Sequence, residues 1–347
     1  MFFIYSWQTF LYSYFYIIGL LGSHADSYIY KYVVPFIYNS LLISGLICSF
    51  FLENYTQIGV LVLWAIYIIV LLIIYNRVRA KFKRHLDCLY NILTADNNRE
   101  LHFIYKLRLN LVFYSFFLYS CYCFVYTFIY NMDYNNPKYA LRTIVGLTWF
   151  YYFMLSGAIF IYIQLICIYR KEEIKQWLLH YKSIAKTYYI DPNNCEQQLS
   201  KEFYIDYDAA YYNCKRFNNS WKLVIICAFT MISFRIPLGI LYVFYYNNLL
   251  EIPTLAFQII NWFLLVYSIC SLNDENRHLE EFLYKYKIFH SKDIIDDILV
   301  YNKYRSLGIN LYGFIPNFYV FAQIVIIIFN IVLPILLAVA NALLFKQ

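Results

Sequence analysis

The hydrophobic positions of this chain gather in seven long runs, with charged and polar segments between them. A helix needs about 20 apolar residues to cross the hydrocarbon core of a bilayer. A helix also pairs its backbone polar groups within one segment, as the bilayer core demands. The pattern predicts an all-α, polytopic bundle of seven transmembrane helices that forms a single domain over residues 1–347. The predicted spans are 33–52, 57–75, 109–130, 140–169, 221–246, 252–271 and 316–344.

Residues 1–21 are also apolar, but their longest run, Phe10 to Leu20, is too short to predict a span. A signal peptide has a basic segment ahead of its apolar run, and this chain has none. We interpret the segment as an interfacial, packed helix of the mature protein. A spanning helix, which would raise the number of spans to eight, and a cleaved signal peptide are the alternatives.

Composition agrees with this architecture and excludes other classes of protein. Hydrophobic residues make up 62% of the chain and charged residues only 14%, which is more apolar surface than a soluble domain buries. Aromatic residues reach 22%, so many rings are expected inside the bundle as well as at its interfaces. The net charge of +7 is spread over separate loops and predicts no nucleic-acid partner. Nine cysteines without CxxC spacing are interpreted as reduced and structural.

The basic residues predict the orientation of the bundle, because short cytosolic loops carry an excess of Lys and Arg. Three connections are basic, namely 76–108, 170–222 and 271–315. The loops 53–56, 131–139 and 247–251 carry only Lys138. We therefore predict a multi-pass protein of the cell membrane with a cytosolic amino terminus and an extracellular carboxyl terminus. A G-protein-coupled receptor has the opposite orientation.

The longer cytosolic connections are predicted to be helical. Apolar residues recur at spacings of three and four in the segment about 170–220, which indicates a helical hairpin with a break at Asp191 to Asn194. Further cytosolic helices are expected at about 272–315. The two apolar stripes need a partner, either in the same chain or in a neighbouring subunit. Their residues are Ile174, Trp177, Leu178, Tyr181, Ile184 and Tyr188 in the first arm, and Leu199, Phe203, Tyr207, Ala210, Tyr211, Cys214 and Phe217 in the second.

The sequence carries no recognised catalytic motif. HExxH, a Walker-type glycine loop and GxSxG are missing, and the six histidines have no metal-ligand spacing. The paired acids Glu172-Glu173 and Asp296-Asp297 are interpreted as surface charge on cytosolic helices. We expect no enzyme activity, no cofactor and no metal site.

Three segments of the chain carry a family resemblance. The stretch Tyr14 to Leu20 contains aromatic residues followed by Ile-Gly-Leu, and the exit of the sixth span runs from Ser268 to Arg277. A charged helix and then Gly313-Phe314 precede the last span. With these features the layout resembles the insect gustatory and odorant receptor superfamily. The family's Thr-Tyr and Gln-Phe motif is absent from the last span, around Ala322 to Pro334, which indicates a divergent gustatory-receptor-like protein.

The resemblance implies an inverted seven-helix subunit that forms a homo- or hetero-tetramer and gates cations in response to an unknown small-molecule ligand. A non-conducting membrane scaffold, an orphan relative of the receptors and a small-solute transporter are the alternatives. Transporters often contain inverted repeats with interrupted spans. This chain has only 9 Gly and 7 Pro and no visible internal symmetry, which disfavours transport.

Polar residues inside the predicted spans are candidates for the ligand site. Arg235 lies deep in the fifth span, where a charge is costly unless it faces the bundle or a wet cavity. Gln258 and Asn261 lie at similar depth in the sixth span, at about 1.5 Å of rise per residue. We predict that these three residues form the floor of a pocket open to the extracellular side. The alternative is a set of satisfied hydrogen bonds between helices, near a kink at Pro237.

Five aromatic residues are candidates to line the same pocket, because a ring with a polar handle suits a small organic ligand. Ordinary packing is the alternative for each of them. They are Trp64, Tyr122, Trp149, Tyr151 and Tyr152.

The last predicted span, 316–344, is the candidate pore helix. Asn330 and Asn341 are separated by close to three helical turns and so share one face. Four copies of this helix around an axis would present rings of amide dipoles that replace the water around a cation. Pro334 between them would loosen the helix for gating. Alternatively, Asn330 bonds a neighbouring helix and Asn341 caps the outer end.

Overall fold

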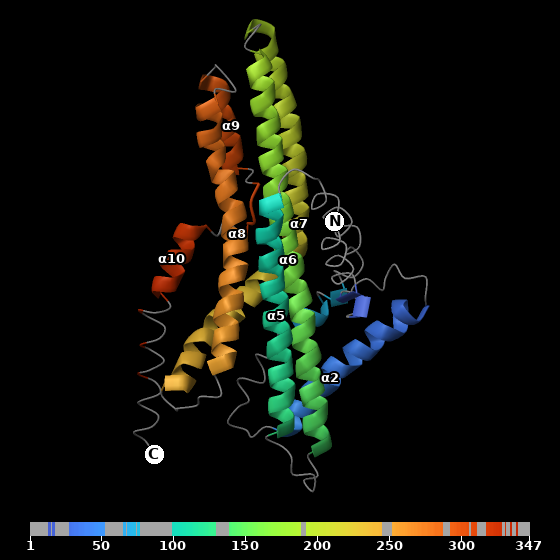
Figure 1. Ribbon diagram of the computed structural model, residues 1–347. Coiled ribbons are helices and arrows are strands. Elements are labelled where there is room, and N and C mark those ends of the chain that lie inside the picture. Colours follow the sequence, from blue (N-terminus) through green and yellow to red (C-terminus); the bar gives the residue numbers. More distant parts are fainter. Residues whose placement is uncertain are drawn as a thin grey trace. The chain divides into compact units, whose positions relative to one another are not determined.

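The computed structural model is almost entirely helical, and no β-strand occurs in the part of the chain that it describes (Figure 1). The all-α prediction is confirmed for that part. The helices are η2 (Ile29–Val33, a π-helix), α2 (Val34–Leu52), α5 (Arg99–Ile129), α6 (Tyr139–Tyr188), α7 (Pro192–Phe244), α8 (Ile252–Tyr286), α9 (Lys292–Tyr304) and α10 (Phe318–Ile327). The described residues are 13–14, 16–17, 28–52, 65–66, 68–73, 75–76, 99–129, 139–188, 192–244, 252–286, 292–304, 307–310, 317–327, 330, 334 and 338.

Four of these helices contain a stretch that is long and apolar enough to cross a membrane, which indicates a membrane protein. The stretches are Val34–Phe51, Leu107–Val125, Tyr139–Ile184 and Ile252–Asp274, and they overlap the first, third, fourth and sixth predicted spans. The fifth predicted span is helical within α7 as far as Phe244. The second and seventh predicted spans lie partly outside the described residues.

Two helices are much longer than a bilayer requires. α6 has 50 residues and α7 has 53, against the roughly 20 that cross the hydrocarbon core. α7 begins at Pro192, because proline fits the first turn of a helix, where its missing N–H is not needed. The predicted break at Asp191 to Asn194 is therefore wrong for Pro192, Asn193 and Asn194, which belong to the helix.

The chain divides into two compact units, and several aromatic contacts join helices of the first, Met1–Ile163. The Tyr14 hydroxyl donates a hydrogen bond to Met154 O at 2.6 Å. Tyr119 of α5 meets Phe153 of α6 edge-on, with ring centroids 4.6 Å apart. The rings of Tyr14, Tyr119 and Phe153 are buried, which confirms that aromatic side chains lie inside the bundle.

In the second unit, Gln164–Gln347, the end of α6 and the start of α7 form a helical hairpin. Trp177 packs on Phe203 with ring centroids 4.7 Å apart, and the Tyr181 hydroxyl donates a hydrogen bond to Asp206 at 2.8 Å. The apolar stripes of the two arms thus find a partner within the chain. Their buried members are Ile174, Leu178, Tyr181, Leu199, Phe203, Tyr207, Cys214 and Phe217.

Helices α9 and α10 also pack within the second unit. The Tyr301 hydroxyl of α9 donates a hydrogen bond to Asp208 of α7 at 2.6 Å. α10 lies beside α8 (Figure 1), where Phe321 contacts Trp262 with ring centroids 4.8 Å apart. Trp262, Val266 and Cys270 of α8 form a buried apolar cluster with Ile236 of α7, and Phe321 and Val325 of α10 cover it.

Candidate functional site

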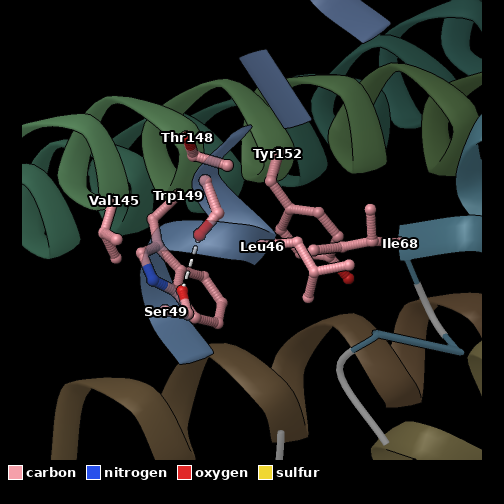
Figure 2. A pocket seen from close by; sticks show the side chains of 8 residues that line it. Leu46, Ser49, Ile68, Val145, Thr148, Trp149 and Tyr152 are labelled. Carbon is pink, nitrogen blue, oxygen red and sulfur yellow. Dashed lines mark hydrogen bonds between the residues drawn. The ribbon is translucent and has the colours of Figure 1, made fainter. Parts of the chain in front are cut away.

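The first unit contains a small hollow between α2 and α6 (Figure 2). The centre of a water molecule can occupy about 30 Å³ of it, and its walls are almost entirely apolar. None of the lining side chains is acidic or basic, so the hollow suits a small uncharged group. The lining residues are Gly45, Leu46, Ser49, Ile68, Val145, Thr148, Trp149 and Tyr152.

A glycine allows the close approach of helices that forms one end of the hollow. A Cβ atom at Gly45 would lie only 2.1 Å from Thr148 Oγ1, so no larger residue fits without movement. The Thr148 hydroxyl lies 2.8 Å from Ile144 O on its own helix and 3.2 Å from Leu41 O on α2, and its single proton can serve either acceptor. The Ser49 hydroxyl donates a hydrogen bond to Gly45 O at 2.8 Å (Figure 2). The hydroxyl groups at this end are thus engaged by backbone carbonyls.

The aromatic side of the hollow contains two residues that the sequence predicted. Trp149 and Tyr152 meet edge-on with ring centroids 5.9 Å apart, and both contribute to the wall (Figure 2). Phe153 stacks on Trp149 with ring centroids 5.7 Å apart. Neighbouring rings therefore fix the orientation of Trp149 before any ligand is present.

The other aromatic candidates do not line the hollow in the described part of the chain. Tyr122 stacks on Tyr119 of the same helix with ring centroids 6.1 Å apart. Tyr151 stacks on Tyr38 of α2 at 4.1 Å. Trp64 lies outside the described residues. A ligand-contact role for Tyr122, Tyr151 and Trp64 stays a prediction.

The polar candidates of the predicted pocket floor lie in the second unit. Gln258 and Asn261 are buried on α8, on one helical stripe with the buried Thr254 and Ser268. Asn261 Nδ2 donates a hydrogen bond to Phe257 O at 2.8 Å. Gln258 Oε1 is buried and has no hydrogen-bond partner among the described residues.

The third member of the predicted floor is Arg235. It lies on α7, and its side chain is outside the described part of the structure. The contact of Arg235 with Gln258 and Asn261 stays a prediction.

The candidate pore residues are only partly described. Asn330 and Pro334 are exposed in the single chain, and Asn341 lies outside the described residues. A side chain that lines an axis between four copies is exposed when one copy is considered alone, and so is a side chain that faces lipid. Exposure therefore does not distinguish these two positions. The pore role of these residues stays a prediction.

Sequence analysis did not find Gly45, Ile68, Val145 and Thr148 as neighbours of Trp149 and Tyr152. The spacing of Gly45 and Ser49, two small residues four apart in an apolar helix, was the available signal, because small residues let membrane helices approach closely. Nothing in one sequence indicates which helix makes that approach.

Among the described residues outside the predicted spans, several ionisable groups of the second unit have a raised pKa, and Tyr181, Tyr207 and Cys214 show the strongest shifts. Burial raises the pKa of the Tyr207 phenol, and burial raises the pKa of the Cys214 thiol to about 12. Both groups stay protonated at neutral pH. Because the thiolate is the nucleophilic form of cysteine, we expect Cys214 to react slowly in the folded protein.

Metal binding is not indicated in the described part of the chain, where no three His, Cys, Asp or Glu side chains come together in a possible metal site. Comparison with known protein families and with curated proteins finds no match for this chain.

Proposed function

We propose that this chain is a subunit of a ligand-gated cation channel of the insect gustatory-receptor type, with seven spans and a cytosolic amino terminus. The observation that carries the proposal is the aromatic hollow at Trp149 and Tyr152, which combines an apolar interior with preoriented rings. Sites for small organic ligands have this composition. The proposed ligand is small, uncharged and mostly apolar.

The proposed orientation gives the hollow a consistent depth. With a cytosolic amino terminus, the first span rises towards the outside and the fourth returns from it. Gly45 and Ser49 then lie in the outer half of the first span, and Thr148 and Tyr152 in the outer half of the fourth. Both helices thus place the hollow in the outer leaflet of the membrane. This is the side from which an extracellular ligand arrives.

Voltage-clamp recording on cells that express the chain, with and without candidate partner subunits, tests the proposal. A panel of small uncharged organic molecules is applied, and the same currents are measured for Trp149→Ala and Tyr152→Ala. Each substitution is expected to raise the half-maximal ligand concentration about tenfold, the effect of losing one buried ring contact. Tyr114→Ala is the matched control, because Tyr114 is a tyrosine of the same unit that is 58% exposed.

A tag placed after Gln347 tests the orientation independently of current. The proposal expects the tag to bind antibody on intact cells. A tag that is reached only after permeabilisation refutes the inverted topology. Absence of current under every ligand, with the tag outside, favours the non-conducting scaffold, and ligand uptake without current favours the transporter.

A further inference from the structure

A short non-helical segment, residues 307–309, is buried in the second unit and follows α9 in the sequence. Leu307 and Ile309 are each only 1% exposed. A buried segment outside a helix lacks the regular partners of a helical backbone, so its N–H and C=O groups must be paired by other means. Side chains from α7 and α8 pair its three carbonyl groups and the Ile309 N–H.

Helix α7 holds the first two carbonyl groups of the segment. The Cys214 thiol donates a hydrogen bond to Leu307 O at 2.8 Å, and Asn218 Nδ2 donates one to Gly308 O at 3.1 Å. Cys214 and Asn218 are one helical turn apart, so they present their donors on one face of α7.

Helix α8 holds the end of the segment with a single asparagine. Asn273 Nδ2 donates a hydrogen bond to Ile309 O at 3.2 Å, and the Ile309 N–H donates one to Asn273 Oδ1 at 2.6 Å. Both polar atoms of one side chain are thus matched to both polar groups of one residue. Gly308 makes this fit sterically possible, because a Cβ atom there would lie 2.1 Å from Asn273 Oδ1.

The same helix also holds the start of α10. Phe318 contacts Tyr267 with ring centroids 5.7 Å apart, and Phe321 contacts Trp262 at 4.8 Å. Tyr267 lies about 9 Å along α8 from Asn273, at 1.5 Å of rise per residue. The chain is therefore attached to α8 at two described places, at Ile309 and at the first turn of α10.

Two anchors of one chain on the same helix are thermodynamically linked. While the Asn273 anchor holds, the aromatic anchor forms at a high effective concentration, because most of the loop-closure entropy has already been lost. Release of either anchor weakens the other. Loss of the Asn273 hydrogen bonds should therefore lower the stability of the start of α10.

We propose that Asn273, Asn218 and residues 307–309 form a mechanical joint that couples the α7–α8 pair to α10. The joint lets a displacement of α8 at Asn273 change the stability of the first turns of α10. Its use in gating, by transmitting a movement of α8 to a pore lined by the last span, rests on the proposed function. The coupling itself does not.

Hydrogen exchange of the full chain in lipid nanodiscs, followed by mass spectrometry, tests the coupling. Asn273→Leu removes both hydrogen bonds at similar volume, and Gly308→Ala displaces the same asparagine sterically. Each variant is expected to raise exchange about tenfold at residues 307–310, the effect of leaving a buried backbone group without its partner. The joint further predicts a rise of several-fold at residues 318–322.

Two further variants keep the test decisive. Asn218→Ala removes only one hydrogen bond and serves if the stronger variants do not fold. Asn219→Ala is the matched control, because Asn219 is the next residue on α7 and is exposed. A rise at 307–310 with unchanged protection at 318–322 overturns the joint, and so does the absence of any change.

The exchange measurement does not depend on conduction, so its result separates the joint from the proposed function. If currents are obtained, the same variants are expected to shift the half-maximal ligand concentration without changing the residues of the hollow. Coupling in the exchange data without any current would leave the joint standing and refute the channel.

Discussion

The contact between Gly45 and Thr148 allows a quantitative test of how closely α2 and α6 pack. In Gly45→Ala, the new Cβ atom would lie 2.1 Å from Thr148 Oγ1, 2.3 Å from Cγ2 and 2.4 Å from Cβ. The Cβ atom cannot move by side-chain rotation, so the helices must separate by about 1 Å to restore an ordinary contact. Overpacking of this kind costs about 1–3 kcal/mol. We expect Gly45→Ala to lose that amount of unfolding free energy.

Reversible unfolding in SDS, followed by tryptophan fluorescence, measures the loss. Ser40→Ala is the control, because it changes an exposed residue of the same helix and should stay within about 0.5 kcal/mol of the parent protein. Gly45→Ala also removes space from the hollow, so it should weaken the ligand response if the proposed function holds.

A double-mutant cycle shows whether the steric clash with Thr148 causes the loss of unfolding free energy in Gly45→Ala. Thr148→Gly removes all three atoms that the new Cβ would meet, and its own cost in helix propensity is only about 0.3 kcal/mol, because threonine is already a poor helix former. Combined with Gly45→Ala, it should give a favourable coupling energy of about 1–2 kcal/mol. If Gly45→Ala is as stable as the parent protein, or if the cycle gives no coupling energy, the close approach of α2 and α6 is refuted.

Three further predictions concern single contacts. Tyr14→Phe removes the hydrogen bond to Met154 O and should lower the unfolding free energy by about 1 kcal/mol in the same SDS titration; an unchanged midpoint contradicts it. The Cys214 pKa of about 12 lies above the value of 9.0 for a free thiol, so its contribution to stability is complete below pH 9 and is lost as the pH rises from 9 towards 12. Alkylation followed by peptide mass spectrometry should find Cys214 unmodified at pH 8 in the folded protein and modified after unfolding, and rapid modification of the folded protein would be the contrary result. Asn317→Ala removes the side chain that accepts a hydrogen bond from the Val320 N–H at 2.8 Å, so hydrogen exchange at Val320 should rise about fivefold, and equal rates in both proteins would show that the cap is not needed.

Much of the local structure could be predicted from the sequence. Long apolar runs predict long helices because each helix satisfies its own backbone inside a bilayer, and α2, α5, α6 and α8 agree with this. The apolar stripes of the hairpin followed from the helical repeat, which is a property of neighbouring residues. The candidate site was predicted only by residue type: Trp149 and Tyr152 line the hollow, whereas Tyr122 does not.

The sequence alone determined that the chain is helical, rich in membrane-spanning stretches and packed with aromatic rings, because these properties depend on composition and on periods of a few residues. Only the tertiary structure decided that Gly45 meets Thr148 and that Asn273 holds Ile309. Each of these pairs joins residues far apart in the chain, and its energy depends on a match of shape or hydrogen bonding between two helices or a helix and a loop. A glycine or an asparagine in one sequence has the same local properties whichever partner it finds, so the fold has to supply the partner.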